Sequence, residues 1–370
     1  MIYFDHNATT PIDPQVLEAM QPFLTTFYGN PSSLHRHGRA VKTAIDQARQ
    51  QIAALVKVSP EQVIFTSGGT EANNIAISAA KASKKGHALM SSTEHPSIVE
   101  PMQRLALQDI HVEKIAVNSN GLIAADILGS SITSNTGFIS IMQANNETGV
   151  IQDIATLGAL AKERGIIFHT DAVQSCGKLD VDFGALNVNL MSLSGHKIYG
   201  PKGVGALVYD KKVNLSPVFY GGGQETRLRP GTENVAGIIG FGKAAELALQ
   251  LQESRATQLL GLRKKLEEGI SGIAGLVIAG SGVERLPNTS QILMDTVDGE
   301  MLLMQLDQQS IAVSSGSACS SNSKLPSPVL KAMGYKDKLA LSAIRVSLGQ
   351  QSTLEEVDVF IAALKATINR

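Results

Sequence analysis

Tryptophan is absent from the 370 residues, and aromatic residues make up only 4% of them. No apolar run reaches the roughly 18–20 residues that a membrane helix needs, and no basic segment followed by an apolar one opens the chain, so neither a membrane protein nor a secretory leader is predicted. The 32 Lys and Arg nearly balance the 33 Asp and Glu, which gives no support to direct binding of nucleic acid. Glycine, by contrast, is plentiful at 34 residues, as suits an enzyme with tight turns around a small polar ligand.

Cysteine is scarce as well, with only two residues, Cys176 and Cys319, in unlike sequence contexts. They cannot form a disulfide framework, so free thiols in a reducing, cytoplasmic compartment are expected. Cys319 stands among small polar residues and glycine at 314–323, a composition that predicts an exposed, mobile loop from which a thiol can reach into a site. Cys176 has no such surroundings and is expected to be structural.

Short apolar segments alternate with helical patterns over the first two thirds of the chain. The predicted strands are Gln62–Thr66, Ala88–Ser91, Phe138–Gln143, Gly165–Thr170, Leu190–Leu193 and Gly205–Tyr209. This alternation favours an α/β fold with a mostly parallel sheet covered by helices on both faces. Two helical patterns between Asn234 and Ser271 lead into a smaller α+β region. We therefore predict a large domain at 14–255 and a small domain composed of 1–13 with 256–370.

Polar clusters follow five of the predicted strands. They are SGGT at 67–70, STEH at 92–95, NNET at 145–148, TDAVQ at 170–174 and SGHK at 194–197. Ligands of parallel α/β sheets bind at the carboxyl ends of the strands. The five clusters are therefore predicted to converge on one site.

Lys197 ends the last of these clusters and precedes the glycine-rich stretch GPKGVG. A lone lysine is usually a solvated surface residue, but in this position it could form a Schiff base with an aldehyde cofactor. Such a cofactor needs a carboxylate for its pyridinium nitrogen, and Asp171 stands at the end of an apolar strand, where an unpaired charge is costly. A helix cap or a buried salt bridge would explain Asp171 equally well.

The turn TSGGTE at 66–71 lies between a predicted strand and a predicted helix. Glycines and a helix N-terminus together suit a phosphate group, although the turn has neither P-loop nor GxGxxG spacing and is weak evidence alone. His95, which also follows a strand, could stack on a cofactor ring. Only its position supports that role, because most histidines are ordinary core or surface residues.

Together these features resemble a known family, the cysteine desulfurases of the NifS/IscS type, which are class-V aminotransferases that use pyridoxal 5′-phosphate (PLP). The resemblance extends from residue 3 to residue 349. It is carried by YFDHNATTPIDP, GNPSSLH, FTSGGTEANN, TEHPS, NNETGVIQDI, HTDAVQSCGK, SLSGHKIYGPKGVGAL, GGGQETRLRPGTEN and SSGSACSS. It implies the fold-type-I architecture, with a large domain around a mostly parallel seven-stranded sheet and a smaller α+β domain.

The resemblance also implies roles for single residues. Lys197 would bond to the cofactor aldehyde, Asp171 would pair with the pyridinium nitrogen, and Gln174 would hydrogen-bond the phenolic oxygen. His95 would stack on the ring and serve in acid–base steps. The residues implied to hold the phosphate are Gly69, Thr70, Ser194 and His196.

Three further residues receive roles from the same resemblance. Thr232 would reach the phosphate of the neighbouring subunit's cofactor, which implies a homodimer. Asn146, beside the cofactor, and Arg345 would bind the substrate carboxylate, for which the planar fork of arginine is suited. Without the resemblance, a structural ion pair would be the preferred explanation of Arg345.

The implied activity is the conversion of L-cysteine to L-alanine. Cys319, as a thiolate, would take the substrate sulfur as a persulfide and pass it to an acceptor protein. The sequence does not choose between an iron–sulfur scaffold and a thiolation enzyme as the acceptor. One departure from many relatives is the stretch Pro-Ser-Ile-Val after His95, where they have Lys-Ala-Val.

Several alternatives share parts of this constellation. A selenocysteine lyase or a cysteine C–S lyase would keep Lys197 and Asp171, but would have no need to hold sulfur on Cys319. A plain aminotransferase likewise leaves the Cys319 loop unexplained. A non-catalytic sulfur-relay or scaffold protein would have no reason to keep Lys197, Asp171, His95 and Cys319 together.

Overall fold

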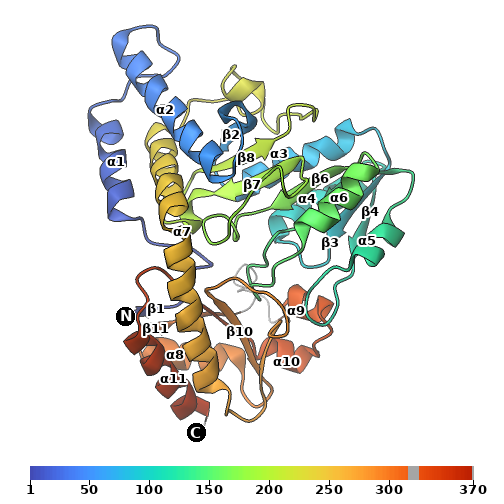
Figure 1. Ribbon diagram of the computed structural model, residues 1–370, viewed down its shortest axis with the longest axis vertical. Helices are drawn as coiled ribbons and strands as arrows, with labels where there is room; N and C mark the ends of the chain where they lie inside the picture. Colours follow the sequence, from blue (N-terminus) through green and yellow to red (C-terminus); the bar gives the residue numbers. More distant parts are fainter. Residues whose placement is uncertain (316–324, 369–370) are drawn as a thin grey trace.

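The computed structural model describes residues 1–315 and 325–368. A seven-stranded sheet forms the centre of the larger part, as predicted (Figure 1). Its strands, in spatial order, are β2 (Val63–Thr66), β8 (Gly205–Tyr209), β7 (Leu190–Ser194), β6 (Ile167–Asp171), β5 (Thr136–Ser140), β3 (His87–Ser91) and β4 (His111–Ile115). The strands from β7 to β4 are parallel, whereas β8 runs antiparallel to both of its neighbours. The expectation of a mostly parallel sheet is therefore confirmed.

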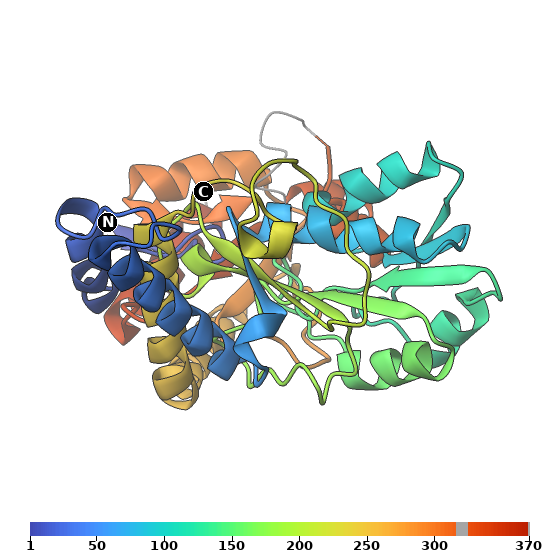
Figure 2. The ribbon, with the colours of Figure 1, turned by 90° about the horizontal axis from the view of Figure 1, so that it is seen from above.

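Helices cover both faces of this sheet (Figure 2). On one face lie α3 (Gly69–Ala82) and α4 (Pro96–Ala106), and on the other α2 (Arg36–Leu55), α6 (Ile154–Glu163) and the first part of α7 (Val235–Ile270). Neighbouring residues of one strand enter opposite cores: in β3, Leu89 packs with the α6 side and Met90 with the α3 side. The continuous apolar strands seen in the sequence follow from this double coverage.

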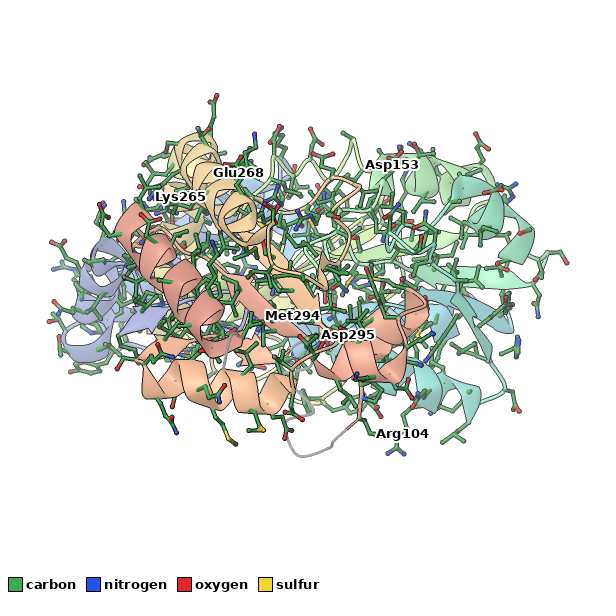
Figure 3. The ribbon with its side chains drawn as sticks, turned by 90° about the horizontal axis from the view of Figure 1, so that it is seen from below. Arg104, Asp153, Lys265, Glu268, Met294 and Asp295 are labelled. Carbon is green, nitrogen blue, oxygen red and sulfur yellow. The ribbon has the colours of Figure 1, made fainter. Side chains whose placement is uncertain are left out.

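The remaining helices and strands complete the two parts of the molecule. The helices are α1 (Pro14–Thr25), α5 (Ala125–Ser131), α8 (Gly299–Gln308), α9 (Pro328–Ala332), α10 (Asp337–Leu341) and α11 (Leu354–Ile368). The smaller sheet has the order β12 (Ser314–Ser315), β13 (Ile344–Ser347), β10 (Thr289–Met294) and β9 (Leu276–Ile278), and β1 (Ile2–Tyr3) pairs with β11 (Ile311–Ala312). Seen from below, Met294 marks the end of β10, while Asp153, which caps α6, lies on the other part of the molecule (Figure 3). Among the described residues, no helix is long and apolar enough to cross a membrane.

One helix, α7, runs through both parts. The sequence predicted two helices between Asn234 and Ser271, and this prediction was wrong: a single 36-residue helix is present. Its first half packs in the core under the large sheet through residues such as Phe241, and its second half packs in the small core through residues such as Leu266. No buried residue lies between Ala248 and Leu259, so the apolar pattern is interrupted there although the backbone is not. The predicted domain boundary at 255 falls inside this helix.

Candidate active site

Asp171 is the last residue of β6, and its carboxylate is buried. One carboxylate oxygen accepts a hydrogen bond from Asn73 Nδ2 at 2.8 Å, and the other accepts one from the backbone N–H of Val173 at 3.0 Å. Neither partner is a cation, so the buried-salt-bridge alternative is excluded for the described residues. A buried carboxylate with neutral partners suits a cationic N–H ligand.

A chain of hydrogen bonds connects Asp171 to His95. Asn73 Nδ2 also donates to Ser97 Oγ at 2.8 Å, and that hydroxyl lies 2.8 Å from His95 Nδ1. The Ser97 backbone N–H donates to the same ring nitrogen at 3.1 Å, so Nδ1 is an acceptor and the neutral ring carries its proton on Nε2. Burial lowers the pKa of His95 below its ordinary value, against the attraction of Asp171, so the ring is held neutral.

Lys197 follows β7 on a short 3-10 turn, Gly195–Lys197. Its Nζ donates to the backbone carbonyl of Ala8 at 2.7 Å and to that of Asn7. Gln174 Nε2 donates to the same Asn7 carbonyl at 2.9 Å. The N-terminal segment therefore joins Lys197 to Gln174, for which the family resemblance implies a contact with the cofactor. No sequence pattern indicated this connection.

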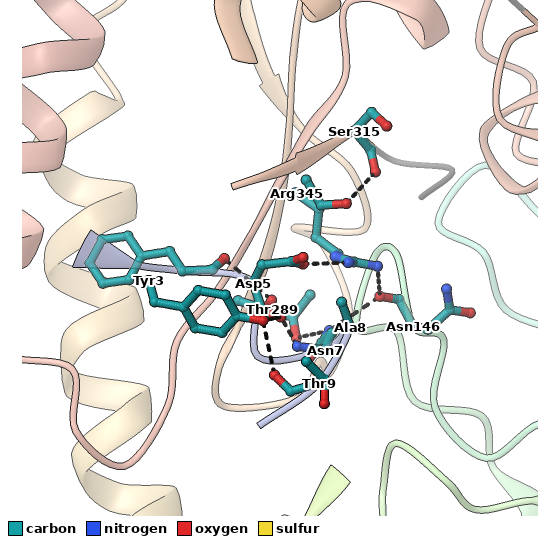
Figure 4. Close-up of polar contacts among 12 residues, drawn as sticks. Tyr3, Asp5, Asn7, Ala8, Thr9, Asn146, Thr289, Ser315 and Arg345 are labelled. Atoms are coloured by element: carbon teal, nitrogen blue, oxygen red, sulfur yellow. Dashed lines mark hydrogen bonds and ion pairs between the residues drawn. The ribbon is translucent and has the colours of Figure 1, made fainter. Parts of the chain in front are cut away.

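The side chain of Asn7 extends this network to the predicted substrate-binding residues. Its Nδ2 donates to the backbone carbonyl of Asn146 at 3.2 Å, and Arg345 Nη1 donates to the same carbonyl at 3.1 Å (Figure 4). Arg345 also forms an ion pair of 2.6 Å with Asp5. Its side chain is 2% exposed, and its Nε, which is buried, has no hydrogen-bond partner among the described residues. The structural ion pair is thus present, and the two hydrogen bonds use only two of the five guanidinium N–H donors.

The four predicted phosphate residues line one pocket of about 420 Å³. Its lining includes Gly69, Thr70, Ser194 and His196, together with Ala8, Thr9, Ser67, Gly68, Glu71, Lys202 and Gly203. The pocket lies at the N-terminus of the 14-residue helix α3, where backbone N–H groups and the helix dipole favour an anion. Lys202, which the sequence analysis had not singled out, adds a positive charge.

Glycine is required at position 69 by close packing. A Cβ atom there would lie 2.9 Å from Val173 Cγ2 and 3.7 Å from Ser194 Cβ. Val173 is the residue whose N–H holds Asp171, so the phosphate turn and the acidic strand end meet at this point. The phosphate pocket and the buried carboxylate are therefore parts of one site, and their chemistry fits PLP.

Two predicted residues stand apart from this constellation. Thr232 is exposed and does not line the pocket. Cys319 lies outside the described residues. Cys176 is buried, and burial raises the pKa of its thiol to about 12, in agreement with the expected structural role. Sequence reasoning gave no role to Asn7, Asn73 and Ser97, although all three stand inside quoted motifs.

The loop that carries Thr232 is fixed to the large sheet by two acidic residues. Glu225 accepts two hydrogen bonds from Arg49, at 2.8 and 2.6 Å, and one from the Phe65 N–H at 2.9 Å. Glu71, in the phosphate turn, accepts one from Arg229 Nε at 3.1 Å. These contacts hold the exposed loop next to the phosphate pocket.

Known proteins resemble the chain over its whole length. A family model described as aminotransferase class-V matches residues 2–360. A cysteine desulfurase IscS of Salmonella arizonae is 45% identical, with 100% of this chain and 93% of that protein covered. A NifS-like protein from Rickettsia africae superposes with a TM-score of 0.91 at 35% identity, covering 100% of both chains. SspA in complex with cysteine superposes with a TM-score of 0.83 at 34% identity, covering 94% of this chain and 99% of that one.

Proposed function

The chain belongs to the class-V aminotransferase family and, within it, to the cysteine desulfurases of the NifS/IscS type, and on that basis we propose that it removes sulfur from L-cysteine with PLP as cofactor. The main observation behind the proposal is that a buried carboxylate, an anion pocket lined by glycines and a lysine lie at the same edge of the sheet. Asp171 supplies the first, Gly69 shapes the second and Lys197 is the third. The cysteine-bound relative SspA supports the choice of substrate.

The residues that would hold the cofactor follow from the site. Asp171 would pair with the pyridinium N–H, Gln174 would contact the ring oxygen, and His95 would stack on the ring. The pocket formed by Gly69, Thr70, Ser194 and His196 would take the phosphate. When bound at Lys197, PLP supplies an electron sink for the electron pair released at the substrate α-carbon.

The chain's own groups would carry the remaining steps. Arg345 and Asn146 orient the substrate carboxylate, and the Lys197 Nζ takes the α-proton once it is free of the cofactor. The Cys319 thiolate forms a bond to the substrate sulfur while the bond between that sulfur and the substrate Cβ breaks. The electron pair stays with the carbon, which is protonated, so the products are alanine and a persulfide on Cys319.

The proposal extends to assembly, location and acceptor. Thr232 is exposed on a loop with Phe219 and Tyr220, whose side chains are 60% and 89% exposed, and we place a second copy of the chain over this loop. The reactive thiol requires a reducing compartment, so we place the enzyme in the cytoplasm. We propose an iron–sulfur scaffold or a thiolation enzyme as the acceptor of the persulfide sulfur.

A single turnover tests the activity. The holoenzyme receives L-cysteine without reductant, and peptide mass analysis follows the residue that gains sulfur. The proposal expects one added sulfur on Cys319 with release of alanine, no transfer in Cys319→Ser, and full transfer in the matched variant Cys176→Ala. Release of pyruvate, ammonia and sulfide with Cys319 unmodified would instead identify a C–S lyase that eliminates the substrate sulfur. Thr232→Ala tests the shared site, because loss of this side chain should weaken cofactor binding in the dimer.

A further inference from the structure

Two histidines face each other at the outer edge of the large sheet. His87 opens β3 and His111 opens the neighbouring edge strand β4, and the two residues are directly paired in the parallel register. Glu113 is two positions beyond His111, so its side chain projects from the same face of β4. Three metal-ligating side chains therefore share one face of two adjacent strands.

The potential ligand atoms of these residues are close together. One atom from each of the three side chains lies within 4.8 Å of the other two, and His87 Nε2 is 3.7 Å from Glu113 Oε2. The two imidazole rings are stacked, with centroids 5.4 Å apart and an angle of 17° between their planes. In a tetrahedral zinc site the ligand atoms stand about 3.3–3.5 Å apart. His111 and Glu113 are exposed, so small side-chain rotations can close the difference.

His87 provides an independent sign of a ligand. The residue is only 5% exposed, and its Nε2 is buried without a hydrogen-bond partner among the described residues. The distance of 3.7 Å to Glu113 is too long for a hydrogen bond. A buried polar nitrogen without a partner is costly, and a metal ion would satisfy it.

The other nitrogen of His87 is already held in place. Its Nδ1 lies 2.8 Å from Thr136 Oγ1 on β5, the strand on the inner side of β3. Metal-binding histidines commonly make such a contact through their second nitrogen, which fixes the direction of the ligating one. Here it directs Nε2 toward the β4 side chains.

We propose that His87, His111 and Glu113 bind a divalent transition-metal ion of the zinc type, with water in the remaining coordination position. Two imidazoles and one carboxylate favour such an ion over Mg²⁺ or Ca²⁺, which prefer oxygen ligands. Both histidines begin their strands, whereas Asp171 ends its strand, so the metal site lies at the end of the sheet opposite to the PLP site. The bound ion would fasten the edge strand β4 to β3 (Figure 1).

Zinc titration of the holoenzyme, without a polyhistidine tag, tests this proposal. All proteins carry Cys319→Ser, so that the reactive thiol does not compete, and calorimetry measures stoichiometry and affinity. We expect one ion per chain, and an affinity reduced at least about tenfold by His111→Ala or Glu113→Gln. The matched control is Lys114→Ala. Lys114 lies on the same strand, but its side chain points to the face opposite to that of His111 and Glu113, so the zinc affinity should be unchanged.

Two further readouts separate this site from unspecific binding. Co²⁺ bound by nitrogen and oxygen ligands should give a visible absorption band without a thiolate charge-transfer band. Zinc should also raise the midpoint temperature of unfolding of the Cys319→Ser protein. It should not change the midpoint temperature of the protein that carries His111→Ala and Glu113→Gln in addition. Equal zinc affinity in that combination, or no stoichiometric binding by the parent protein, would overturn the proposal.

Discussion

Nη2 of Arg345 lies 2.6 Å from Oδ1 of Asp5, although 340 positions separate the two residues along the chain. The contact joins the N-terminal segment to β13, beside the site where the substrate carboxylate is proposed to bind. The guanidinium therefore has a carboxylate partner from the protein itself, while its buried Nε has no hydrogen-bond partner within residues 1–315 and 325–368. Substitutions of these two residues can therefore distinguish a role of Arg345 in substrate binding from a role in folding.

Asp5→Asn and Arg345→Lys should differ in their effect on substrate binding. Asp5→Asn keeps the guanidinium fork, so we expect the KM for L-cysteine to change less than about threefold. Because Arg345 is buried, the loss of its charged partner should appear instead as a lower free energy of unfolding. Arg345→Lys loses the bidentate geometry, so KM should rise at least about tenfold. Steady-state kinetics measure both. A raised KM in Asp5→Asn with an unchanged KM in Arg345→Lys would show that Arg345 is only structural.

Ser97→Ala should shift the pH dependence of catalysis. The Ser97 hydroxyl accepts from Asn73 and donates to His95 Nδ1, which stabilises the neutral imidazole. Its loss should raise the pKa of His95 by less than about one unit, because one hydrogen bond contributes about 1 kcal/mol.

The acidic limb of the pH profile for kcat/KM should then move to higher pH. Ser130→Ala, an exposed change on α5, is the control and should leave the profile in place. An identical profile in Ser97→Ala would mean that the Ser97 hydroxyl does not orient His95.

The two cysteines should react very differently with iodoacetamide. With its pKa raised to about 12 by burial, Cys176 has only about one part in ten thousand as thiolate at pH 8. We expect alkylation of the folded holoenzyme to modify Cys319 and spare Cys176, as followed by peptide mass mapping. Modification of both residues at similar rates would contradict the buried position of Cys176; unfolded protein, in which both should react, is the control.

Lys178 should make the stability of the cofactor-free protein depend on pH. Burial and the neighbouring Lys197 lower its pKa to about 7 from an unfolded value of 10.5, and its Nζ donates to the Gln174 carbonyl at 2.9 Å. The unfolded chain then binds more protons between pH 7 and 10.5, so the free energy of unfolding rises with pH across this window. One group contributes at most about 1.4 kcal/mol per pH unit.

Urea unfolding between pH 6.5 and 9 measures this dependence. Lys178→Met should flatten the rise, whereas Lys211→Met, at an exposed position, should leave it unchanged. If the free energy of unfolding changes with pH equally in the parent protein, Lys178→Met and Lys211→Met, then Lys178 keeps an ordinary pKa in the folded state.

The sequence predicted the sheet and the strand-end positions of Asp171 and Lys197 because both depend on local patterns. Alternating apolar segments define the strands, and the polar residue that ends each strand must lie at the common edge. The seven-strand count and the residue roles came from the family resemblance. The contacts of Asn7 could not be predicted, because they join it to residues 139 and 190 positions away.

Ser97 illustrates a second limit of sequence reasoning. It drew attention only within the motif TEHPS and as part of a departure from relatives. Its bond to His95 is local, but its bond to Asn73 depends on how α3 and α4 pack. The single helix α7 shows the converse error. The stretch without buried residues between Ala248 and Leu259 was taken as a break in the backbone, although no proline interrupts the segment.

The continuity of α7 limits how the two parts of the molecule can move. Rotation of one part against the other would have to bend a helix of 36 residues, and a sharp bend needs a proline, a bulge or an inserted group in the hydrogen-bond ladder. The helix therefore holds the two parts in a fixed relative orientation and does not act as a hinge. Opening and closing of the site during turnover should fall to loops, and limited proteolysis should fail to release the small part as a folded fragment.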